Sequence, residues 1–356
     1  MEMAEASSPR SRISATQEIR QLRAQVKAME DVLETLQFKW IEQLPDSRSL
    51  QEAHHLARIK YRLIQTQNEH SELENAFVRQ QLMYASLQTT ILQAPLYSNS
   101  EELMMMLQFQ TRLGRESKER QIKLLAHFNR SLATIPSSVN KITQTAIDKA
   151  LGHRKEGDTK EPLTPLSQIN ITGLVNSTLI SSVFMLEIPN ATLKEVYEAI
   201  LVSYIEAIPA LMQRHFGIHA TRKMLDSADS PAIYYRLDLH GNDITSSMNH
   251  VICSELTSSY GMVHVDSIID DALHPVSRTN SLQYIVSGIT ITPRIEAATG
   301  KTLSVRLQRV LVYHYNLLPG DSALMKDLAI IRPVLNGDLI TSSVCEYIKR
   351  TNISQE

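Results

Sequence analysis

The chain has 356 residues, of which 43% are hydrophobic and 21% are charged, and its formal net charge is -2. These proportions are those of globular proteins, so they exclude general disorder, and the charge gives no overall attraction to nucleic acid. Two cysteines, Cys253 and Cys345, are too few for a disulfide framework and indicate a reducing compartment. No signal peptide and no membrane-spanning stretch stands out, so we expect a cytoplasmic or nuclear protein of two main domains.

The first half of the chain carries a coiled-coil pattern. Residues 1–15 are small and polar, which predicts a disordered tail. From Ile19 onward apolar residues recur at steps of three and four, the spacing of a heptad seam, and we predict coiled-coil helices over 16–94 with a break at Pro45. The predicted dimer seam consists of Ile19, Leu22, Val26, Met29, Leu33, Leu36, Leu56, Leu63, His70, Leu73, Phe77, Tyr84 and Leu87. The alternative is that the two runs fold back on each other as an antiparallel hairpin within one chain.

Shorter helices are expected over 95–151. The second of them begins at Ser117 and is predicted to end before Pro136, because proline lacks an amide hydrogen and clashes with the preceding turn. Residues 152–165 are charged, poor in apolar side chains and bracketed by glycine and proline. They are therefore predicted to be a linker.

The remaining residues, 166–356, read as one α+β domain. A β-like segment at 178–188 precedes a helix that Pro209 is expected to kink or divide, and a final helical segment covers 322–350. Between the helices come six segments rich in β-branched and aromatic residues: 218–226, 232–240, 250–257, 260–269, 282–292 and 303–317. Their gaps are too short for crossover helices, so we predict a seven-stranded antiparallel sheet that curls around long helices, a helix-grip arrangement.

Neither a DNA-binding arm nor a catalytic motif is complete. The stretch before the heptads offers basic residues, but Pro9 interrupts it and no asparagine occurs before Asn68, so nucleic-acid binding is not expected without a complete basic arm. Those basic residues are Arg10, Arg12, Arg20, Arg23 and Lys27. The motifs HExxH, CxxC and GxGxxG, a P-loop and a nucleophile elbow are all missing. We therefore expect no catalytic residue, no metal and no cofactor.

The order of strand, helix, six strands and helix resembles the START-like superfamily of domains that bind lipids and other hydrophobic ligands. The heptad helices, the stretch LMMMLQFQTRLG and the ending VYHYNLLPGD resemble a family of oomycete proteins. Members of that family join a basic-zipper-like coiled coil to a START-like domain, and some are labelled mating-specific proteins or zipper transcription factors. The resemblance implies the fold and, more loosely, ligand binding.

We expect a non-enzymatic protein that binds a lipid or another hydrophobic small molecule and pairs through its coiled coil with itself or with a related protein. The alternatives are a zipper-type transcription regulator or partner subunit with a ligand-sensing domain, and a structural interaction protein whose cavity is filled by side chains. If the apolar face of the last strand is internal, Arg309 enters the cavity and needs a carboxylate partner, for which Glu255 is one choice; otherwise Arg309 lies at the sheet edge and reaches water. The candidate cavity residues are Tyr235, Leu237, Cys253, Glu255, Arg309, Tyr313 and Leu335.

Overall fold

The computed structural model describes residues 15–43, 46–91, 99–152, 165–225, 231–241, 244–295 and 302–353. The chain divides into an N-terminal unit, 1–74, and a larger compact unit, 75–356. The expected disordered tail lies outside the described residues except for Ala15, and so does the expected linker except for its two end residues, Gly152 and Pro165.

Two long helices run through the predicted coiled-coil region. They are α1 (Ala15–Gln43) and α2 (Ser47–Ile91), and the side chain of Asp46 accepts hydrogen bonds from the first amides of α2. The described seam side chains within the N-terminal unit are exposed: Val26, Met29, Leu33, Leu36, Leu56, Leu63, His70 and Leu73. A hairpin would bury these side chains against each other, so the intrachain alternative lacks the packing it requires. The predicted seam side chains of Ile19, Leu22 and Leu87 lie outside those described.

The last turns of α2 belong to the compact unit. Leu82 and Ala85 are buried in its core, and the side chain of Gln81 accepts a hydrogen bond of 3.0 Å from the backbone amide of Ile171. Phe77 and Tyr84, two further seam positions, remain about half exposed. The compact unit therefore starts well before residue 166, where the sequence placed its boundary.

Helix α3 (Asn99–Leu107) is followed by one long helix, α4 (Ser117–Gly152). The prediction that a helix ends before Pro136 is wrong, because α4 continues through this proline. The neighbouring Ile135 and Val139 are completely buried against the sheet. We attribute the continuity to this burial, which offsets the roughly 3 kcal/mol that an internal proline costs.

The main sheet has eight antiparallel strands in the order β2-β3-β10-β9-β7-β6-β5-β4. The α+β class is confirmed, but the predicted count of seven omitted β2 (Leu166–Gly173). That strand is short and polar and pairs on one side only, with β3, so its sequence carries little strand signal. The other strands are β3 (Thr178–Pro189), β4 (His219–Met224), β5 (Ala232–His240), β6 (Thr245–Leu256), β7 (Gly261–Ser267), β9 (Leu282–Ile295) and β10 (Thr302–Tyr315).

A separate parallel ladder joins β1 (Arg112–Leu113), which precedes α4, to β8 (Asp270–Asp271), which follows β7. It ties the segment that leads into α4 to the loop between two strands of the main sheet. This ladder matters for the polar contacts described below.

The helix after β3 is divided into three parts: α5 (Leu193–Glu198), a π-helical segment η1 (Ala199–Glu206) and α6 (Ile208–Phe216). Thr192 and Glu195 form a capping box at its start, and Gly217 ends it in the left-handed conformation. Pro209 lies in the first turn of α6, so the division expected at this proline is confirmed.

The C-terminal helical segment is two helices, α7 (Ser322–Leu335) and α8 (Asp338–Ile353). Gly337 separates them with a φ of 94°, and a Cβ atom at this position would collide with the ring of Phe184. Both facts require glycine at the break.

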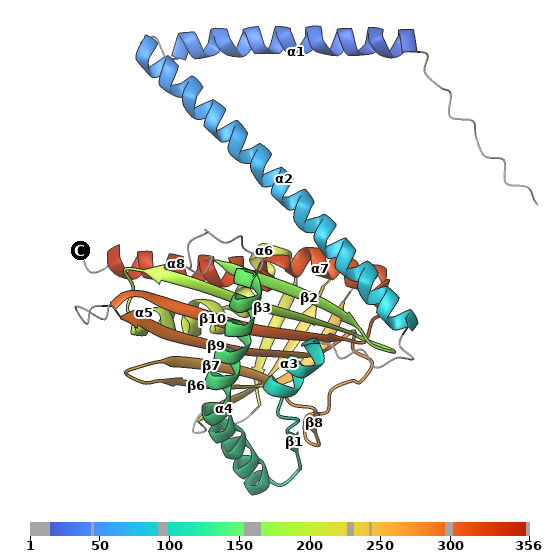
Figure 1. The fold of residues 1–356 in the computed structure, drawn as a ribbon, viewed down its shortest axis with the longest axis vertical. Helices are drawn as coiled ribbons and strands as arrows, with labels where there is room; N and C mark the ends of the chain where they lie inside the picture. The colour runs from blue at the N-terminus through green and yellow to red at the C-terminus, as the bar shows by residue number, and fades with distance from the viewer. Residues whose placement is uncertain are drawn as a thin grey trace, which may run out of the picture. The chain divides into compact units, whose positions relative to one another are not determined.

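The sheet has an inner and an outer face, each covered by different helices (Figure 1). Helices α5 to α8 with η1 pack on the inner face, whereas α3 and α4 cross the outer face. Alternation along β10 illustrates this, because Val305, Leu307 and Leu311 join the inner core while Val310 and Val312 join the outer one.

One stretch of the described chain, Ser322–Thr351, is long and apolar enough to cross a membrane by length and composition alone. The sequence predicted no membrane-spanning stretch, so this candidate was missed. Half of its most apolar window is buried inside the molecule, and the break at Gly337 interrupts it, which is how the core helices of a globular domain look.

Candidate functional site

A cavity lies between the inner face of the sheet and the helices that cover it. Its atom-free space is about 970 Å³, a figure that takes in any open solvent at its mouth. The wall is largely apolar, and most of it comes from five strands and from η1, α6 and α7. Its residues from the strands are Tyr235, Leu237, Leu239, His250, Val265, Leu282, Ile285, Ser287, Leu311, Tyr313 and Tyr315; those from the helices are Tyr204, Ile205, Ile208, Leu211, Met212, Asp327, Ile331, Val334 and Leu339; Ile218, Gly241 and Ile244 complete it.

Three of the candidate residues from the sequence, Tyr235, Leu237 and Tyr313, lie on this wall. Leu335 is buried in the same core at the end of α7 but is not part of the wall. Burial raises the pKa of the Tyr235 hydroxyl to about 12 and also raises the pKa of Tyr313, so both side chains are neutral hydrogen-bonding groups at physiological pH.

Arg309 is fully buried, so the alternative in which it reaches water is wrong. Its guanidinium donates to the hydroxyl oxygen of Tyr204 at 3.1 Å and to the backbone carbonyls of Val334 and Leu335. The expected ion pair with Glu255 is also absent, because the carbonyl oxygens at the C-terminal end of α7 supply the negative potential instead. Ser182 donates to the Leu335 carbonyl too, so this end of α7 is held to β3 and β10.

Cys253 and Glu255 lie on the other face of the sheet, which corrects their placement in the cavity. Cys253 packs in the outer core with Leu124 of α4, and burial raises the pKa of its thiol to about 12. Glu255 is two residues further along the same strand, and it accepts a hydrogen bond of 2.7 Å from the hydroxyl of Tyr260. Side chains of β6 alternate between faces, so the even-numbered residues are the ones that face inward.

The sequence analysis missed the most polar residues of the wall, His250, Asp327, Tyr315 and Tyr204. Tyr315 donates a hydrogen bond of 2.6 Å to Asp327 of α7, and burial raises the pKa of that carboxyl. His250 lies three residues from Cys253 and therefore on the opposite face of the strand, so placing Cys253 in the cavity put His250 outside it. Asp327 and Tyr204 come from helices, whose inward side depends on how they pack.

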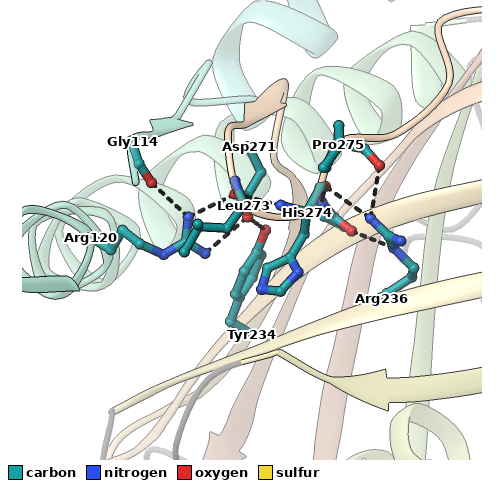
Figure 2. A network of polar contacts seen from close by, with 9 residues as sticks. Gly114, Arg120, Tyr234, Arg236, Asp271, Leu273, His274 and Pro275 are labelled. Atoms are coloured by element: carbon teal, nitrogen blue, oxygen red, sulfur yellow. Dashed lines mark hydrogen bonds and ion pairs between the residues drawn. The ribbon is translucent and has the colours of Figure 1, made fainter. Parts of the chain in front are cut away.

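The outer face carries a buried network of polar contacts centred on Asp271 (Figure 2). Its carboxylate accepts two hydrogen bonds from Arg120 of α4, at 2.7 and 2.9 Å, and one from the hydroxyl of Tyr234. Burial by itself would raise the pKa of Asp271, but these bonds and the amides of Leu273 and His274 outweigh it and hold the pKa at about 2. The network fixes the start of α4 to the β7–β8 region.

A second buried cluster lies nearby, where α4 crosses β7. The Asp266 carboxylate accepts from the backbone amide of Phe109 at 2.9 Å and lies 3.7 Å from Nε2 of His127. Burial raises the pKa of Asp266 to about 7, and burial lowers the pKa of His127 to about 4 and of His264 to about 3. His264 bridges Ser131 of α4 and the carbonyl of Leu107.

Within the part of the chain that is described, no group of three or more histidine, cysteine and acidic side chains has an arrangement that would hold a metal ion. The buried histidine and aspartate side chains contact α4 and the preceding loop. We interpret them as contacts that hold α4 to the main sheet.

No family model and no curated protein matches the chain. Among solved structures, it is similar to a STAR-related lipid transfer protein of Xanthomonas axonopodis, with 11% identity over 52% of this chain and 97% of that one and a TM-score of 0.33. It is also similar to human STARD10, with 7% identity over 58% and 80% and a TM-score of 0.34. A Thalictrum norcoclaurine synthase aligns with 9% identity over 52% and 98% and a TM-score of 0.27.

TM-scores this low carry no weight by themselves, and the fold assignment rests on the strand order and helix placement of this chain. An antiparallel sheet wrapped around a long C-terminal helical segment, with a cavity between them, defines a START-like helix-grip domain. Long N-terminal helices precede it.

Proposed function

We propose that the protein binds a lipid or another hydrophobic small molecule in the inner-face cavity, and that it acts by binding rather than by catalysis. The observation that carries this proposal is the wall itself, which consists mainly of aliphatic and aromatic side chains with a few polar groups. Binding in a concave, mostly apolar site of this kind is favourable because it removes apolar surface of the ligand from water. The same observation speaks against a structural domain whose cavity is filled by side chains.

The proposed mechanism is occlusion. Helices α7 and α8 close one side of the cavity, and the break at Gly337 gives them a point about which they can change their relative orientation. Helix α7 is held to the sheet by Arg309 and Ser182 at its end and by Tyr315 at Asp327, whereas none of the described residues of α6 is buried, so movement of α6 is the simpler route for a ligand. Closure then buries the ligand without bond chemistry.

Native mass spectrometry of the gently purified full-length protein tests this function, first as isolated and then after incubation with a mixed phospholipid and sterol extract. The expected result is a retained or acquired adduct of lipid size. The variant Ser287→Leu, which places an isobutyl group in the cavity wall, should lose the adduct while keeping its fold. An empty protein that takes up nothing from the extract would refute ligand binding.

We further propose that the heptad seam of α1 and α2 pairs with a second copy or a related coiled-coil protein. Its described apolar side chains within the N-terminal unit are exposed, and a coiled-coil partner would cover them. The double variant Leu63→Glu and Leu73→Glu should convert a dimer to a monomer in sedimentation experiments. Tyr61→Glu, at an exposed position off the seam, is the matched control and should remain dimeric.

A zipper-type regulator is the second candidate, favoured by that same exposed seam and by Arg23 and Lys27 at the N-terminal side of α1. In this reading the cavity senses a ligand, and the partner helix supplies the complete basic arm. The protein itself would reside in the cytoplasm or the nucleus. A sequence-specific DNA footprint of the mixed dimer would support it, whereas binding that disappears at moderate salt would show only nonspecific charge. Kinship with the oomycete zipper proteins stays a prediction.

A further inference from the structure

The cavity wall contains one histidine whose hydrogen-bonding groups are not used by the protein. His250 is 1% exposed, and neither of its ring nitrogens has a hydrogen-bond partner among the described residues. The side chain comes from β6, a central strand, and it is part of the cavity wall. Most buried polar groups in proteins are paired, so an imidazole with two unused nitrogens at a cavity wall points to a ligand.

The surroundings of His250 determine the protonation state in which its imidazole would meet that ligand. Its cross-strand neighbour is Tyr235, and the centroids of the two rings lie 5.5 Å apart. The Cζ atom of Arg222 lies over the Tyr235 ring, 4.4 Å from its centroid. Burial, and then the positive charge of Arg222, lower the pKa of His250 to about 3. The imidazole is therefore neutral at physiological pH, with one nitrogen that donates and one that accepts.

The charges around the cavity disfavour a charged ligand. Among the described residues of the wall, the one ionisable acid is Asp327, and no lysine or arginine is present. Two guanidiniums lie near the wall, and both already donate to other groups: Arg309 to Tyr204 and to two carbonyls of α7, and Arg222 to the carbonyl of Ile205, although the Nε atom of each has no described partner. A carboxylate or phosphate in the cavity would therefore lose its hydration without gaining an ion pair with a residue of the wall. An ammonium group would lose as much, since burial raises the pKa of Asp327 and Tyr315 already donates to it.

From this geometry we infer that the cavity takes an uncharged apolar molecule with a hydroxyl or carbonyl oxygen that hydrogen-bonds to His250. The inference rests on the proposed function and gives its ligand a chemical class. His250 donates its N–H to the ligand oxygen, and a hydroxyl can also return a hydrogen bond to the second nitrogen. The remaining contacts of the ligand are apolar, which the wall of leucine, isoleucine, valine and tyrosine side chains supplies.

The test measures how four probes of equal chain length displace the neutral dye Nile red from the full-length protein. The probes are 1-octanol, 1-chlorooctane, octanoate and octylammonium. Wild-type protein should bind 1-octanol more tightly than either ion. In His250→Leu the ratio of the octanol affinity to the chlorooctane affinity should fall roughly tenfold, the usual cost of one lost hydrogen bond in a buried site. His250→Gln, which keeps a donor and an acceptor, should restore much of that ratio.

His314→Leu is the matched control. His314 also has a buried nitrogen without a described partner, but it lies on the outer face and stacks on Tyr284, so its replacement should leave the ratio unchanged. Binding with no change of ratio in His250→Leu would overturn the inference and leave ligand binding intact. Equal affinity for octanoate or octylammonium would overturn the assignment of an uncharged ligand. Failure of all four probes in wild-type protein would overturn the proposed function and the inference with it.

Discussion

The two faces of the eight-stranded sheet differ in how closely helices pack against their buried polar groups. On the outer face, Arg120, Asp271 and Tyr234 satisfy one another, and α4 packs closely enough that a Cβ atom on Gly288 would come within 2.7 Å of Val139. On the inner face, His250 has unused nitrogens beside open space. Unpartnered buried atoms also occur on the outer face, among them Asp266 Oδ1 and His314 Nε2, but they do not line this cavity. The contrast between the faces therefore rests on the open space beside His250.

The largest effect is expected from breaking the outer-face network. Asp271→Ala leaves Arg120 buried without its carboxylate, and loss of one partner of a buried ion pair costs roughly 3–5 kcal/mol of unfolding free energy. Urea denaturation of the full-length protein measures this loss. A combined Arg120→Met and Asp271→Leu variant removes both charges and should be clearly more stable than the single variant. Equal stability of the single variant and wild type would show that the network does not hold α4.

Substitutions at two neighbouring positions of β9 allow a direct comparison, because their side chains point to opposite faces of the sheet. Gly288→Ala should cost about 1–3 kcal/mol, because the new methyl group meets Val139, Ile135 and Leu107 on the outer face. Ser287→Leu, one residue earlier and on the cavity wall, should change stability by less than about 1 kcal/mol while reducing ligand uptake. Thermal unfolding and Nile red binding measure the two effects. A reversed order of the two stabilities would contradict the contrast between a filled face and a face with room.

The last prediction is a dependence of stability on pH that comes from Asp266. Its pKa is about 7 in the folded protein, against an ordinary value of 3.8, so the folded state binds this proton more tightly. The resulting stabilisation is complete below pH 3.8 and is lost as the pH rises through 7, with a slope of at most about 1.4 kcal/mol per pH unit. The effect of His127 runs the other way: its stabilisation is present above pH 6.5 and is lost as the pH falls towards 4.

Asp266→Asn separates the two contributions, because only the acid is removed. The stability of this variant relative to wild type should rise between pH 4 and pH 7 in urea denaturation curves, since wild type alone pays for deprotonation. His127 and Arg130 lie near this carboxyl, His264 stacks on His127, and all three remain in both proteins. A stability difference that stays constant over that range would show that Asp266 does not titrate as described.

Local patterns predicted much of the fold and little of the site. Alternating β-branched residues predicted seven of the eight strands of the main sheet, and Pro209 marked the division of the first covering helix. The edge strand β2 was missed because its pairing with β3 outweighs a weak local preference. The helix through Pro136 was missed because burial of Ile135 and Val139 outweighs the local cost of proline.

The sequence by itself determined the antiparallel α+β class and the heptad seam, since each depends on a period that is written in neighbouring residues. It divided the residues of β10 into two faces and left open which of them is internal. Only the tertiary structure decided that Cys253 and Glu255 lie on the outer face of the sheet, that Arg309 meets the end of α7 and that His250 lies beside a cavity. These placements depend on which face of each strand a distant helix covers. Contacts between residues that are distant in the sequence set that choice, and no local period records them.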